Sequence, residues 1–218
     1  FPGMSGIAHK VELSKNMDKM ARTLPEIYNF HPKTFIIPGS FLQLQQFMLS
    51  IPKKSKRTFI IKPDTGCQGK GIKLIQDPRH VEDYDGYAVA QQYIEPFLVD
   101  GYKFDLRIYA LVTSINPLRI YMLKEGMARF CTEKYNKPKA GNLGEHYSHL
   151  TNFSLNKNSK LFHANKKDIA PDTGCKRTMS SVFKKIQESG GDVELIKEKI
   201  HSIINLTLIS VQPHLHSM

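Results

Sequence analysis

The stretch that decides the fold is IIKPDTGCQGKGI, residues 60–72. Apolar, β-branched residues at both of its ends predict two strands, and the segment between them predicts a flexible loop. The glycines of that loop allow backbone N–H groups to approach phosphate oxygens without obstruction from side chains, while Lys62 and Lys70 supply positive charge. This layout suits a hairpin that covers phosphates, although a generic glycine-rich turn has the same composition.

The loop is not a Walker A motif. That motif needs Gly-x-x-x-x-Gly-Lys-Ser/Thr before a helix, and the segment from Gly66 to Gly71 lacks both the spacing and the hydroxyl residue. A strand rather than a helix is predicted from Ile72 onward. The sequence therefore indicates a phosphate site of a different type from the P-loop.

Short strands are predicted on both sides of this loop. Runs rich in β-branched and aromatic residues, bounded by Gly, Pro or Asp, predict strands over 58–62, 72–75, 87–92 and 105–113. Two further runs, 119–123 and 127–132, are predicted to pair as a hairpin across a turn-like triplet that contains a glycine.

The other regular elements are predicted to be helices. Apolar residues at helical spacing predict helices over 41–48, 178–188 and 193–209. Ser40 and Asp192 precede the first and the last of them as candidate N-caps. A sheet-rich middle followed by helices favours an α+β fold with a cleft over a regular alternation of strands and crossover helices.

A second constellation, QQYIEPFLVDGYKFDLRIYALVTS at 91–114, alternates in polarity. Because side chains in a strand alternate between faces, Lys103, Asp105 and Arg107 are predicted to project on one side and apolar residues on the other. The carboxylate can accept hydrogen bonds from ribose hydroxyls, and the two cations can meet sugar or phosphate oxygens. A surface ladder of ion pairs, worth about 0–1 kcal/mol, has the same pattern.

Composition and charge narrow the class of partner. The chain has 218 residues, 40% of them hydrophobic, which is enough to bury a substantial core. Lys and Arg outnumber Asp and Glu by 31 to 20, and the resulting formal charge of +11 attracts nucleotides, nucleic acid or acidic polypeptide tails. Part of the excess lies in the run 53–57, which also suits a solvated linker. Nucleic acid is disfavoured, since no recognition helix with clustered Arg and no regular aromatic platform is present.

Cysteine and histidine usage argues against disulfides and zinc. Three cysteines at wide spacing, without a Cys-x-x-Cys pair, favour a reducing compartment. His146 and His149 are interpreted as structural, because Glu145 is their only local carboxylate partner. We expect no metal ligands within the chain. No apolar run approaches the roughly 20 residues that span a bilayer, and the first residues lack the features of a signal peptide.

Several blocks of the sequence, taken together, resemble the tubulin tyrosine ligase-like family over nearly the whole chain. They are FPGM with the following Lys10, TFIIP at 34–38, KPDTGCQGKGI at 62–72, QQYIEPFLVDGYKFDLRIYALVTS at 91–114, PLRIY at 117–121, EGMARF at 125–130 and HLTNFSLNK at 149–157. The resemblance implies an ATP-grasp fold, in which ATP lies between two sheet-containing lobes.

The resemblance also implies a nucleotide site. Lys62 is expected to bind phosphate, and Gln68 and Gly69 to belong to the flexible phosphate loop. The hinge beside adenine is expected to comprise Gln91, Gln92, Tyr93 and Ile94. The ribose side and the far wall are expected to comprise Lys103, Phe104, Asp105, Thr151 and Asn152, with Arg107 near the phosphates.

For the amino-acid substrate, the resemblance is to the glutamylating branch. It implies that Arg129, Phe153, Ser154 and Lys176 hold free L-glutamate, and that Arg107 and Arg129 are catalytic. Arginine suits bidentate recognition of a carboxylate. Without the resemblance, Arg129 would be read as an exposed hairpin charge and Lys176 as a loop lysine. Phe153 is a departure from the family pattern, which commonly has Tyr there, so any hydrogen bond of that hydroxyl is lost.

The implied reaction is ATP-dependent ligation. An acceptor carboxylate attacks the γ-phosphoryl group of ATP, and an amine then displaces the phosphate of the acylphosphate to form an amide. ATP and Mg²⁺ are the implied cofactors, and the metal ligands are expected beyond Met218. The implied organisation is the end of an N-terminal region over 1–37, a central lobe with phosphate loop and hinge over 38–100, and a truncated C-terminal lobe over 101–218.

The expected acceptor is the acidic C-terminal tail of tubulin, in free form or in microtubules, and the expected product is polyglutamylated tubulin. A monomer in the cytoplasm and cytoskeleton, including the cilium or basal body, fits this function. Two alternatives stay open from the residues: the same fold adding glycine or tyrosine, and a non-catalytic microtubule-binding fragment.

Overall fold

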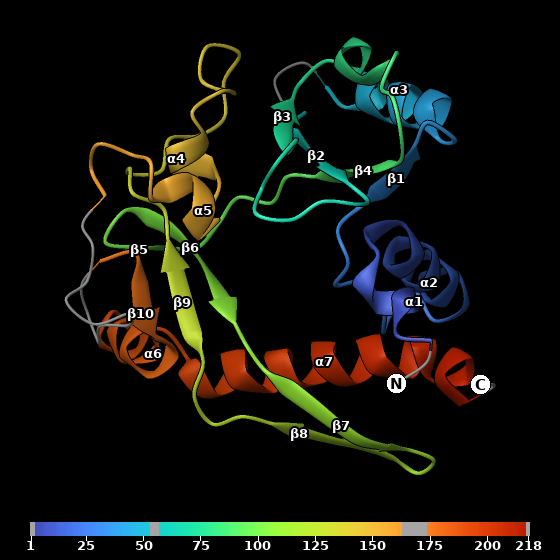
Figure 1. The fold of residues 1–218 in the computed structure, drawn as a ribbon, viewed down its shortest axis with the longest axis vertical. Coiled ribbons are helices and arrows are strands. Elements are labelled where there is room, and N and C mark those ends of the chain that lie inside the picture. Colours follow the sequence, from blue (N-terminus) through green and yellow to red (C-terminus); the bar gives the residue numbers. More distant parts are fainter. Residues whose placement is uncertain (1–2, 53–56, 163–173, 217–218) are drawn as a thin grey trace. The chain divides into compact units, whose positions relative to one another are not determined.

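The computed structural model describes residues 3–52, 57–162 and 174–216 (Figure 1). Most of the basic run 53–57 lies outside these residues. The chain forms two compact units. The first comprises Phe1–Ile94, Pro138–Gly144 and Leu206–Met218, and the second comprises Glu95–Lys137 and Glu145–Asn205. Neither unit is therefore continuous in sequence.

The first unit contains an antiparallel four-stranded sheet with the strand order β1-β4-β2-β3. Its strands are β1 (Thr34–Ile37), β2 (Phe59–Pro63), β3 (Lys73–Ile75) and β4 (Ala88–Gln92). They confirm the strands predicted over 58–62, 72–75 and 87–92. β2 and β3 pair with each other, so they are the two arms of the hairpin predicted around the glycine-rich loop.

Alternate residues of this sheet form an apolar face that packs against α3 (Phe41–Ser50) and the short 3₁₀ helix η1 (Pro78–Val81). Phe59 of β2 is completely buried in this core, as is Leu44 of α3. The helix predicted over 41–48 is confirmed. Ser40 occupies its N-cap position, but its side chain makes no capping hydrogen bond.

Helix α2 (Lys10–Thr23), preceded by the single turn α1 (Ser5–Ala8), packs against β1 and β4. Its buried residues Val11, Ser14 and Met17 recur every three positions and form a stripe along one side of the helix.

The second unit contains an antiparallel sheet with the order β10-β9-β6-β5 and a separate two-stranded sheet of β7 and β8. The strands of the first sheet are β5 (Leu98–Val99), β6 (Tyr102–Arg107), β9 (Met127–Phe130) and β10 (Lys176–Thr178). The second sheet consists of β7 (Ala110–Ile115) and β8 (Leu118–Met122).

Two strand predictions in this unit are wrong. The single strand predicted over 105–113 is divided at residues 108 and 109 into β6 and β7, which belong to different sheets. The runs 119–123 and 127–132 do not pair with each other. β8 pairs with β7 across a two-residue turn at Asn116 and Pro117, and β9 pairs with β6 and β10. Gly126 allows β9 to pair with β6 instead of β8. A Cβ at this position would lie 2.6 Å from the Arg107 carbonyl oxygen, and only a glycine permits this close approach.

The two C-terminal helices are confirmed as α6 (Met179–Glu188) and α7 (Val193–His216), the latter longer than predicted. Asp192 caps α7 as expected, because its Oδ1 accepts from the Leu195 backbone N–H over 3.0 Å. The apolar side of α6, with Val182 and Phe183, packs on the face of the sheet that carries Phe104 and Phe130. Two single turns, α4 (His146–His149) and α5 (Phe153–Asn156), also belong to this unit. None of the described helices is long and apolar enough to cross a membrane.

Phe59→Ala tests the core of the first unit. Removing this fully buried ring leaves a cavity, so we expect the free energy of unfolding to fall by about 3–5 kcal/mol. Urea denaturation measures the change. The matched control is Phe97→Ala, whose ring is 60% exposed, and its expected change is within about 0.5 kcal/mol. Equal losses in the two variants would contradict this assignment of the core.

Candidate active site

The predicted phosphate loop has the backbone conformation that its glycines allow. Gly66, Gln68, Gly69 and Gly71 all have positive φ, so the chain between β2 and β3 turns repeatedly into the left-handed region. At Gly71 a Cβ would lie 2.9 Å from Cγ of Pro63, which excludes larger residues there. Successive backbone turns of this kind can direct several N–H groups toward one anion.

Lys62, the last but one residue of β2, extends from the sheet at the start of this loop. Its Nζ donates a hydrogen bond of 2.7 Å to Oε1 of Gln91 on β4. Burial lowers the pKa of the Lys62 ammonium, and the nearby charge of Lys10 lowers it further. A partly desolvated amine at this position interacts with an incoming anion more strongly than an amine in water does.

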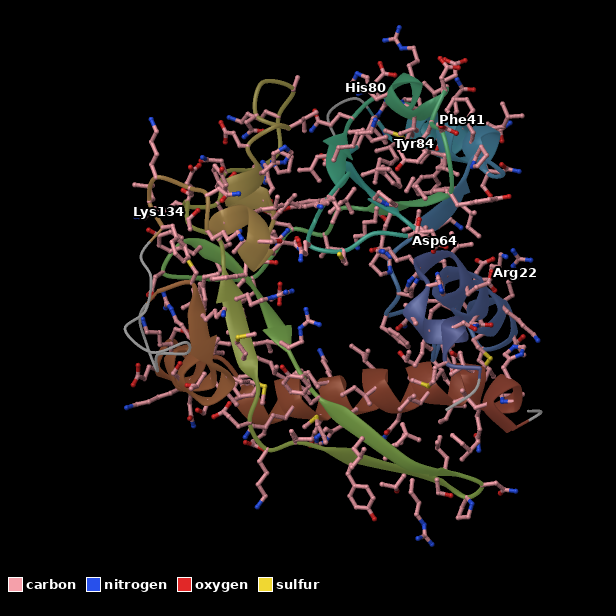
Figure 2. All side chains as sticks on the ribbon, in the orientation of Figure 1. Arg22, Phe41, Asp64, His80, Tyr84 and Lys134 are labelled. Carbon is pink, nitrogen blue, oxygen red and sulfur yellow. The ribbon has the colours of Figure 1, made fainter. Side chains whose placement is uncertain are left out.

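Two residues that the sequence analysis did not assign to the site hold the base of the loop. Asp64, labelled in Figure 2, accepts at Oδ1 from the Val11 backbone N–H over 2.8 Å. Its carbonyl oxygen accepts from Nζ of Lys10 over 3.2 Å. The loop is therefore tied to the first turn of α2, and the block that begins FPGM and includes Lys10 is the sequence signal for this contact.

The predicted hinge residues continue from β4. The backbone N–H groups of Gln92 and Tyr93 donate to the carbonyls of Lys33 and Thr58, over 2.8 and 2.9 Å. Ile94 follows with a side chain that is 61% exposed. An exposed apolar side chain beside a fixed backbone is a suitable surface for a planar base. The side chain of Gln91 serves a different purpose, since it contacts Lys62.

In the second unit, three predicted residues form a row across the sheet. The strand register places Asp105 of β6 opposite Arg129 of β9, and Arg129 opposite Lys176 of β10. Nε of Arg129 donates to Oδ1 of Asp105 over 3.0 Å, and Nη2 donates to Oδ2 over 2.8 Å. This is a bidentate pair, which fixes the plane of the guanidinium.

Lys103, Asp105 and Arg107 of β6 form the predicted charged face. The apolar face of the strand is shorter than predicted, because β6 ends at Arg107. Lys103 donates from Nζ to the His149 carbonyl over 2.7 Å, and Thr151 donates from its hydroxyl to Asp105. Phe104 projects to the other face, where its ring stacks on Phe130 at 5.2 Å between centroids. Ala110 belongs to β7 instead of continuing this strand.

A cavity of about 550 Å³ lies beside the row of charges. Asp105, Arg107 and Arg129 line its polar side, and isoleucines of α7 line the other side. Arg107 is exposed, so its guanidinium is accessible at this cavity. The arrangement places two arginines around one volume, which suits a ligand with carboxylate or phosphoryl oxygens.

Phe153 lies against Lys176, another predicted substrate residue. Nζ of Lys176 is 4.1 Å from the centre of the Phe153 ring, a cation–π contact. Ser154 follows in the same turn, α5, and is half-buried. The second unit thus contains the predicted residues of the ribose side and of the glutamate site, but Phe104 lies on the core-facing side of the sheet, opposite to the face that carries Asp105 and Arg129. Lys62, Gln68, Gly69 and the hinge belong to the first unit.

Asn156 is a residue of this site that the sequence analysis missed. It is fully buried, its Oδ1 accepts from the N–H and the hydroxyl of Thr132, and its Nδ2 donates to the carbonyls of Leu150 and Asn152. These bonds, of 2.7 to 3.0 Å, connect the segment that contains Thr151 and Asn152 to Thr132, which lies two residues after the end of β9. An Asn four positions after a Thr-Asn pair is a weak sequence signal, because its partner Thr132 lies 24 residues away.

Other groups of the second unit are buried in the structure. His149 is almost fully buried, with its ring edge-on to Tyr135 at 5.9 Å. Burial raises the pKa of the Cys131 thiol to about 12, so this cysteine is not a nucleophile at neutral pH. Cys131 and the other two cysteines are free thiols. Among the described residues, no group of three His, Cys, Asp or Glu could hold a metal ion.

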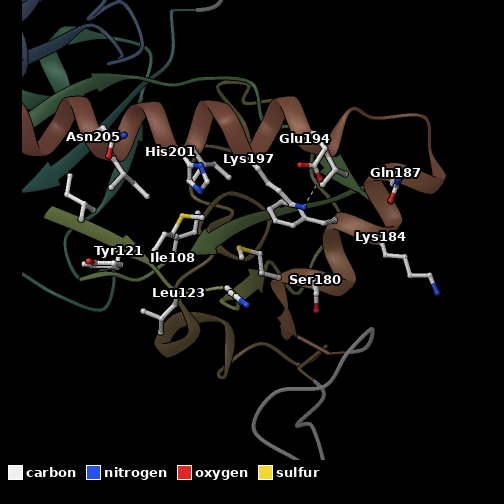
Figure 3. A pocket seen from close by; sticks show the side chains of 18 residues that line it. Ile108, Tyr121, Leu123, Ser180, Lys184, Gln187, Glu194, Lys197, His201 and Asn205 are labelled. Carbon is white, nitrogen blue, oxygen red and sulfur yellow. Dashed lines mark hydrogen bonds and ion pairs between the residues drawn. The ribbon is translucent and has the colours of Figure 1, made fainter. Parts of the chain in front are cut away.

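A larger cavity of about 880 Å³ lies between β8 and the helices α6 and α7 (Figure 3). Its lining combines apolar side chains with polar groups such as His201 and the ion pair of Lys197 with Glu194, 2.7 Å apart. None of the predicted site residues lines it. Volume alone therefore does not identify the active site of this chain.

Comparison with known proteins agrees with the resemblance found in the sequence. The model of the tubulin-tyrosine ligase family matches residues 1–218. The chain is 42% identical over 216 residues to the mouse protein "Tubulin polyglutamylase TTLL7", covering 98% of this chain and 23% of the relative. It is 40% identical over 214 residues to "Tubulin polyglutamylase ttll6" of Danio rerio, covering 98% of this chain and 26% of that relative. It is 38% identical over 216 residues to "Probable beta-tubulin polyglutamylase" of Tetrahymena thermophila, covering 99% and 18%.

Asn156→Ala tests the fastening of the Thr151 segment. The substitution leaves the Thr132 N–H and the Leu150 carbonyl without their partner, so we expect a loss of about 2–4 kcal/mol in unfolding free energy. Thermal and urea denaturation measure it. Asn158→Ala is the control, since its side chain makes one exposed bond of 3.4 Å, and its expected effect is within about 0.5 kcal/mol. A neutral Asn156→Ala would overturn this role.

Proposed function

This chain belongs to the tubulin-tyrosine ligase family, and we infer its function from that membership together with the geometry of its site residues. We propose that it carries the nucleotide-binding and amino-acid-binding residues of an ATP-dependent ligase that adds glutamate to acidic C-terminal tails of tubulin. The row of Asp105, Arg129 and Lys176 across three strands carries the proposal. The chain spans between 18% and 26% of the length of the three relatives above, whose names describe tubulin polyglutamylases.

The first unit supplies the phosphate end of the nucleotide site in this proposal. The glycine-rich turns from Gly66 to Gly71 are proposed to direct backbone N–H groups at the phosphates, and the partly desolvated Lys62 is proposed to direct its ammonium there. Both features favour a polyphosphate over a single carboxylate, because the phosphate oxygens can accept several donors at once. The adenine is proposed to lie beside the hinge from Gln91 to Ile94.

The second unit supplies the ribose side and the wall of the site. Asp105 and Lys103 are proposed to contact the ribose, with Thr151 and Asn152 on the far wall. Arg107, exposed at the 550 Å³ cavity, is proposed to meet the phosphoryl group under transfer. The two lobes of an ATP-grasp fold are the proposed counterparts of the sheets described above.

The proposed reaction uses an acylphosphate. ATP supplies the γ-phosphoryl group: a carboxylate oxygen of the tubulin tail attacks its phosphorus, and the bond to the leaving ADP oxygen breaks. The amine of glutamate then attacks the activated carbonyl carbon, phosphate leaves with the electron pair of the C–O bond, and the nitrogen loses a proton to the departing phosphate or to water as the amide forms. Arg107 and Arg129 stabilise charge that develops on the transferred group, and no side-chain nucleophile is required.

Glutamate recognition is proposed to depend on Arg129 and Lys176, with Phe153 and Ser154 beside them. Arg129 is already held in one plane by Asp105, so little side-chain entropy remains to be lost when a carboxylate binds. A glycine or tyrosine substrate has one carboxylate, whereas free glutamate has two. Two neighbouring cations on β9 and β10 therefore favour glutamate as the added amino acid.

No residue is assigned to Mg²⁺ here, since the described residues contain no group of three His, Cys, Asp or Glu that could hold a metal ion. The residue roles proposed here do not depend on the ion. The charge of +11 suits an acidic acceptor, because it steers a polyanionic tail toward the protein. A cytoskeletal location follows from that acceptor.

The direct test incubates the full-length protein with ATP, Mg²⁺, tubulin and labelled glutamate, glycine or tyrosine, each separately. Mass spectrometry of the tubulin tails then identifies the added residue. We expect glutamate. Glycine or tyrosine would correct the amino acid, and unmodified tubulin together with measurable ATP binding would favour a non-catalytic microtubule-binding protein.

Two variants separate the nucleotide site from the glutamate site. Lys62→Ala is expected to raise the KM for ATP by about tenfold or more, because a charge-assisted contact to phosphate is lost. Arg129→Ala is expected to reduce glutamate incorporation by at least about 100-fold with a smaller effect on ATP binding. The controls are Lys19→Ala and Arg119→Ala, two exposed positions with expected changes within about twofold. Normal glutamate incorporation by Arg129→Ala would refute its assignment.

A further inference from the structure

Gln91 lies at the centre of a hydrogen-bond network behind the phosphate loop. Its Oε1 accepts from Lys62 Nζ over 2.7 Å, and its Nε2 lies 3.0 Å from Oγ1 of Thr34 and 3.4 Å from Nε2 of His31. The sheet register explains the geometry. Gln91 is directly opposite Thr34 of β1 and diagonal to Lys62 of β2, so all three side chains share one face.

The donors in this network fix its protonation state. An ammonium can only donate, so the Gln91 atom next to Lys62 must be the carbonyl oxygen. The amide NH₂ of Gln91 consequently faces Thr34 and His31. Both of its hydrogens are donors, so Nε2 of His31 must accept, and the imidazole is then neutral with its proton on Nδ1.

We propose that His31 and Gln91 are positioning residues that hold the Lys62 ammonium at the phosphate site, and that they do so only while His31 is neutral. The inference rests on the proposed function, in which Lys62 contacts the phosphates of ATP. Gln91 uses one of the three ammonium donors, which leaves two for phosphate oxygens.

Protonation of His31 is incompatible with the network in either orientation of the Gln91 amide. With the observed orientation, an Nε2–H of imidazolium would face the amide NH₂, and two donors would oppose each other. Rotation of the amide by half a turn would satisfy His31, but it would direct the NH₂ at Lys62. In both cases Lys62 loses its partner or moves away from it.

The surroundings of His31 favour the neutral form. Burial lowers the pKa of His31, and the charge of Lys62 on β2 lowers it further, while Asp18 on α2 acts in the opposite direction. Asp18 is itself paired with Arg22, labelled in Figure 2. Lys62 and Asp18 are the charged groups that influence the His31 pKa among the described residues. The network is therefore intact at neutral pH and is lost as the pH falls through the lowered pKa of His31, which lies below the ordinary value of 6.5.

The first experiment needs no nucleotide and no activity. Histidine side chains of the full-length protein are labelled with ¹⁵N, and the His31 signals are assigned with the His31→Gln variant. We expect the neutral tautomer with its proton on Nδ1 and a midpoint of titration below 6.5. A proton on Nε2 at neutral pH, or a midpoint at or above 6.5, would overturn the proposal even if the protein is a ligase of the proposed kind.

The second experiment measures the KM for ATP and kcat between about pH 7.5 and about pH 5 for the wild type and His31→Gln. Glutamine can still accept from Gln91 but cannot be protonated. We expect the wild-type KM, relative to that of His31→Gln, to rise about threefold to tenfold on acidification, with kcat at saturating ATP changing in parallel for both proteins. The ratio cancels the titration of ATP itself.

His80→Gln is the matched control, because the His80 side chain is exposed on helix η1 and is labelled in Figure 2. We expect its pH profile to follow the wild type. Identical profiles for the wild type and His31→Gln would overturn the proposal, as would a wild-type KM that falls on acidification. Gln91→Leu removes the contacts of Gln91 with Lys62 and His31. We expect this variant to raise the KM for ATP at all pH values and to abolish the pH-dependent difference between the wild type and His31→Gln.

Discussion

The pairing of Asp105 with Arg129 is the interaction on which the second unit depends. Both side chains are partly buried, with 19% of the Arg129 side chain and 32% of the Asp105 side chain exposed, and each charge is compensated by the other. Their bidentate contact fixes the register of β6 against β9, which in turn places Lys176 of β10 next to Arg129. Thr151 joins the same carboxylate. The Asp105 carboxylate therefore positions the Arg129 guanidinium, the pairing of β6 with β9 and the segment that contains Thr151.

The first unit solves a similar problem with a neutral partner. Lys62 is held by the amide of Gln91 instead of a carboxylate, so its positive charge is only partly compensated. A carboxylate in that place would neutralise the ammonium and compete with phosphate. Because the neutral amide cannot do so, an incoming anion interacts more strongly with Lys62. The uncompensated charge of the ammonium is correspondingly less stable, and its pKa is lowered. In each unit, a polar side chain of the neighbouring strand directs the cation.

The parts of this molecule whose signals are local could be predicted from the amino-acid sequence. The hairpin around the glycine-rich loop, the charged face of β6 and the Asp192 cap follow from alternation and from residues within a few positions. The predicted pairing of β8 with β9 was wrong. A turn-like triplet that contains a glycine can connect two strands of different sheets as well as two arms of one hairpin. Asn156 and the contact of Lys10 with Asp64 could not be predicted, since their partners lie as far as 54 residues away. The family resemblance named site residues, but the network of Gln91 and His31 became visible only in three dimensions.

The position of Phe153 shows how a site can tolerate a departure from its family. Tyrosine has a ring and a hydroxyl, and phenylalanine keeps only the ring. Lys176 lies 4.1 Å from the centre of that ring, so this contact of its ammonium is with the aromatic face, which both residues offer. The second ring contact of Phe153, with Phe162 at 5.7 Å, likewise needs no hydroxyl. Any polar contact that a tyrosine hydroxyl would make is therefore absent, while both ring contacts are kept.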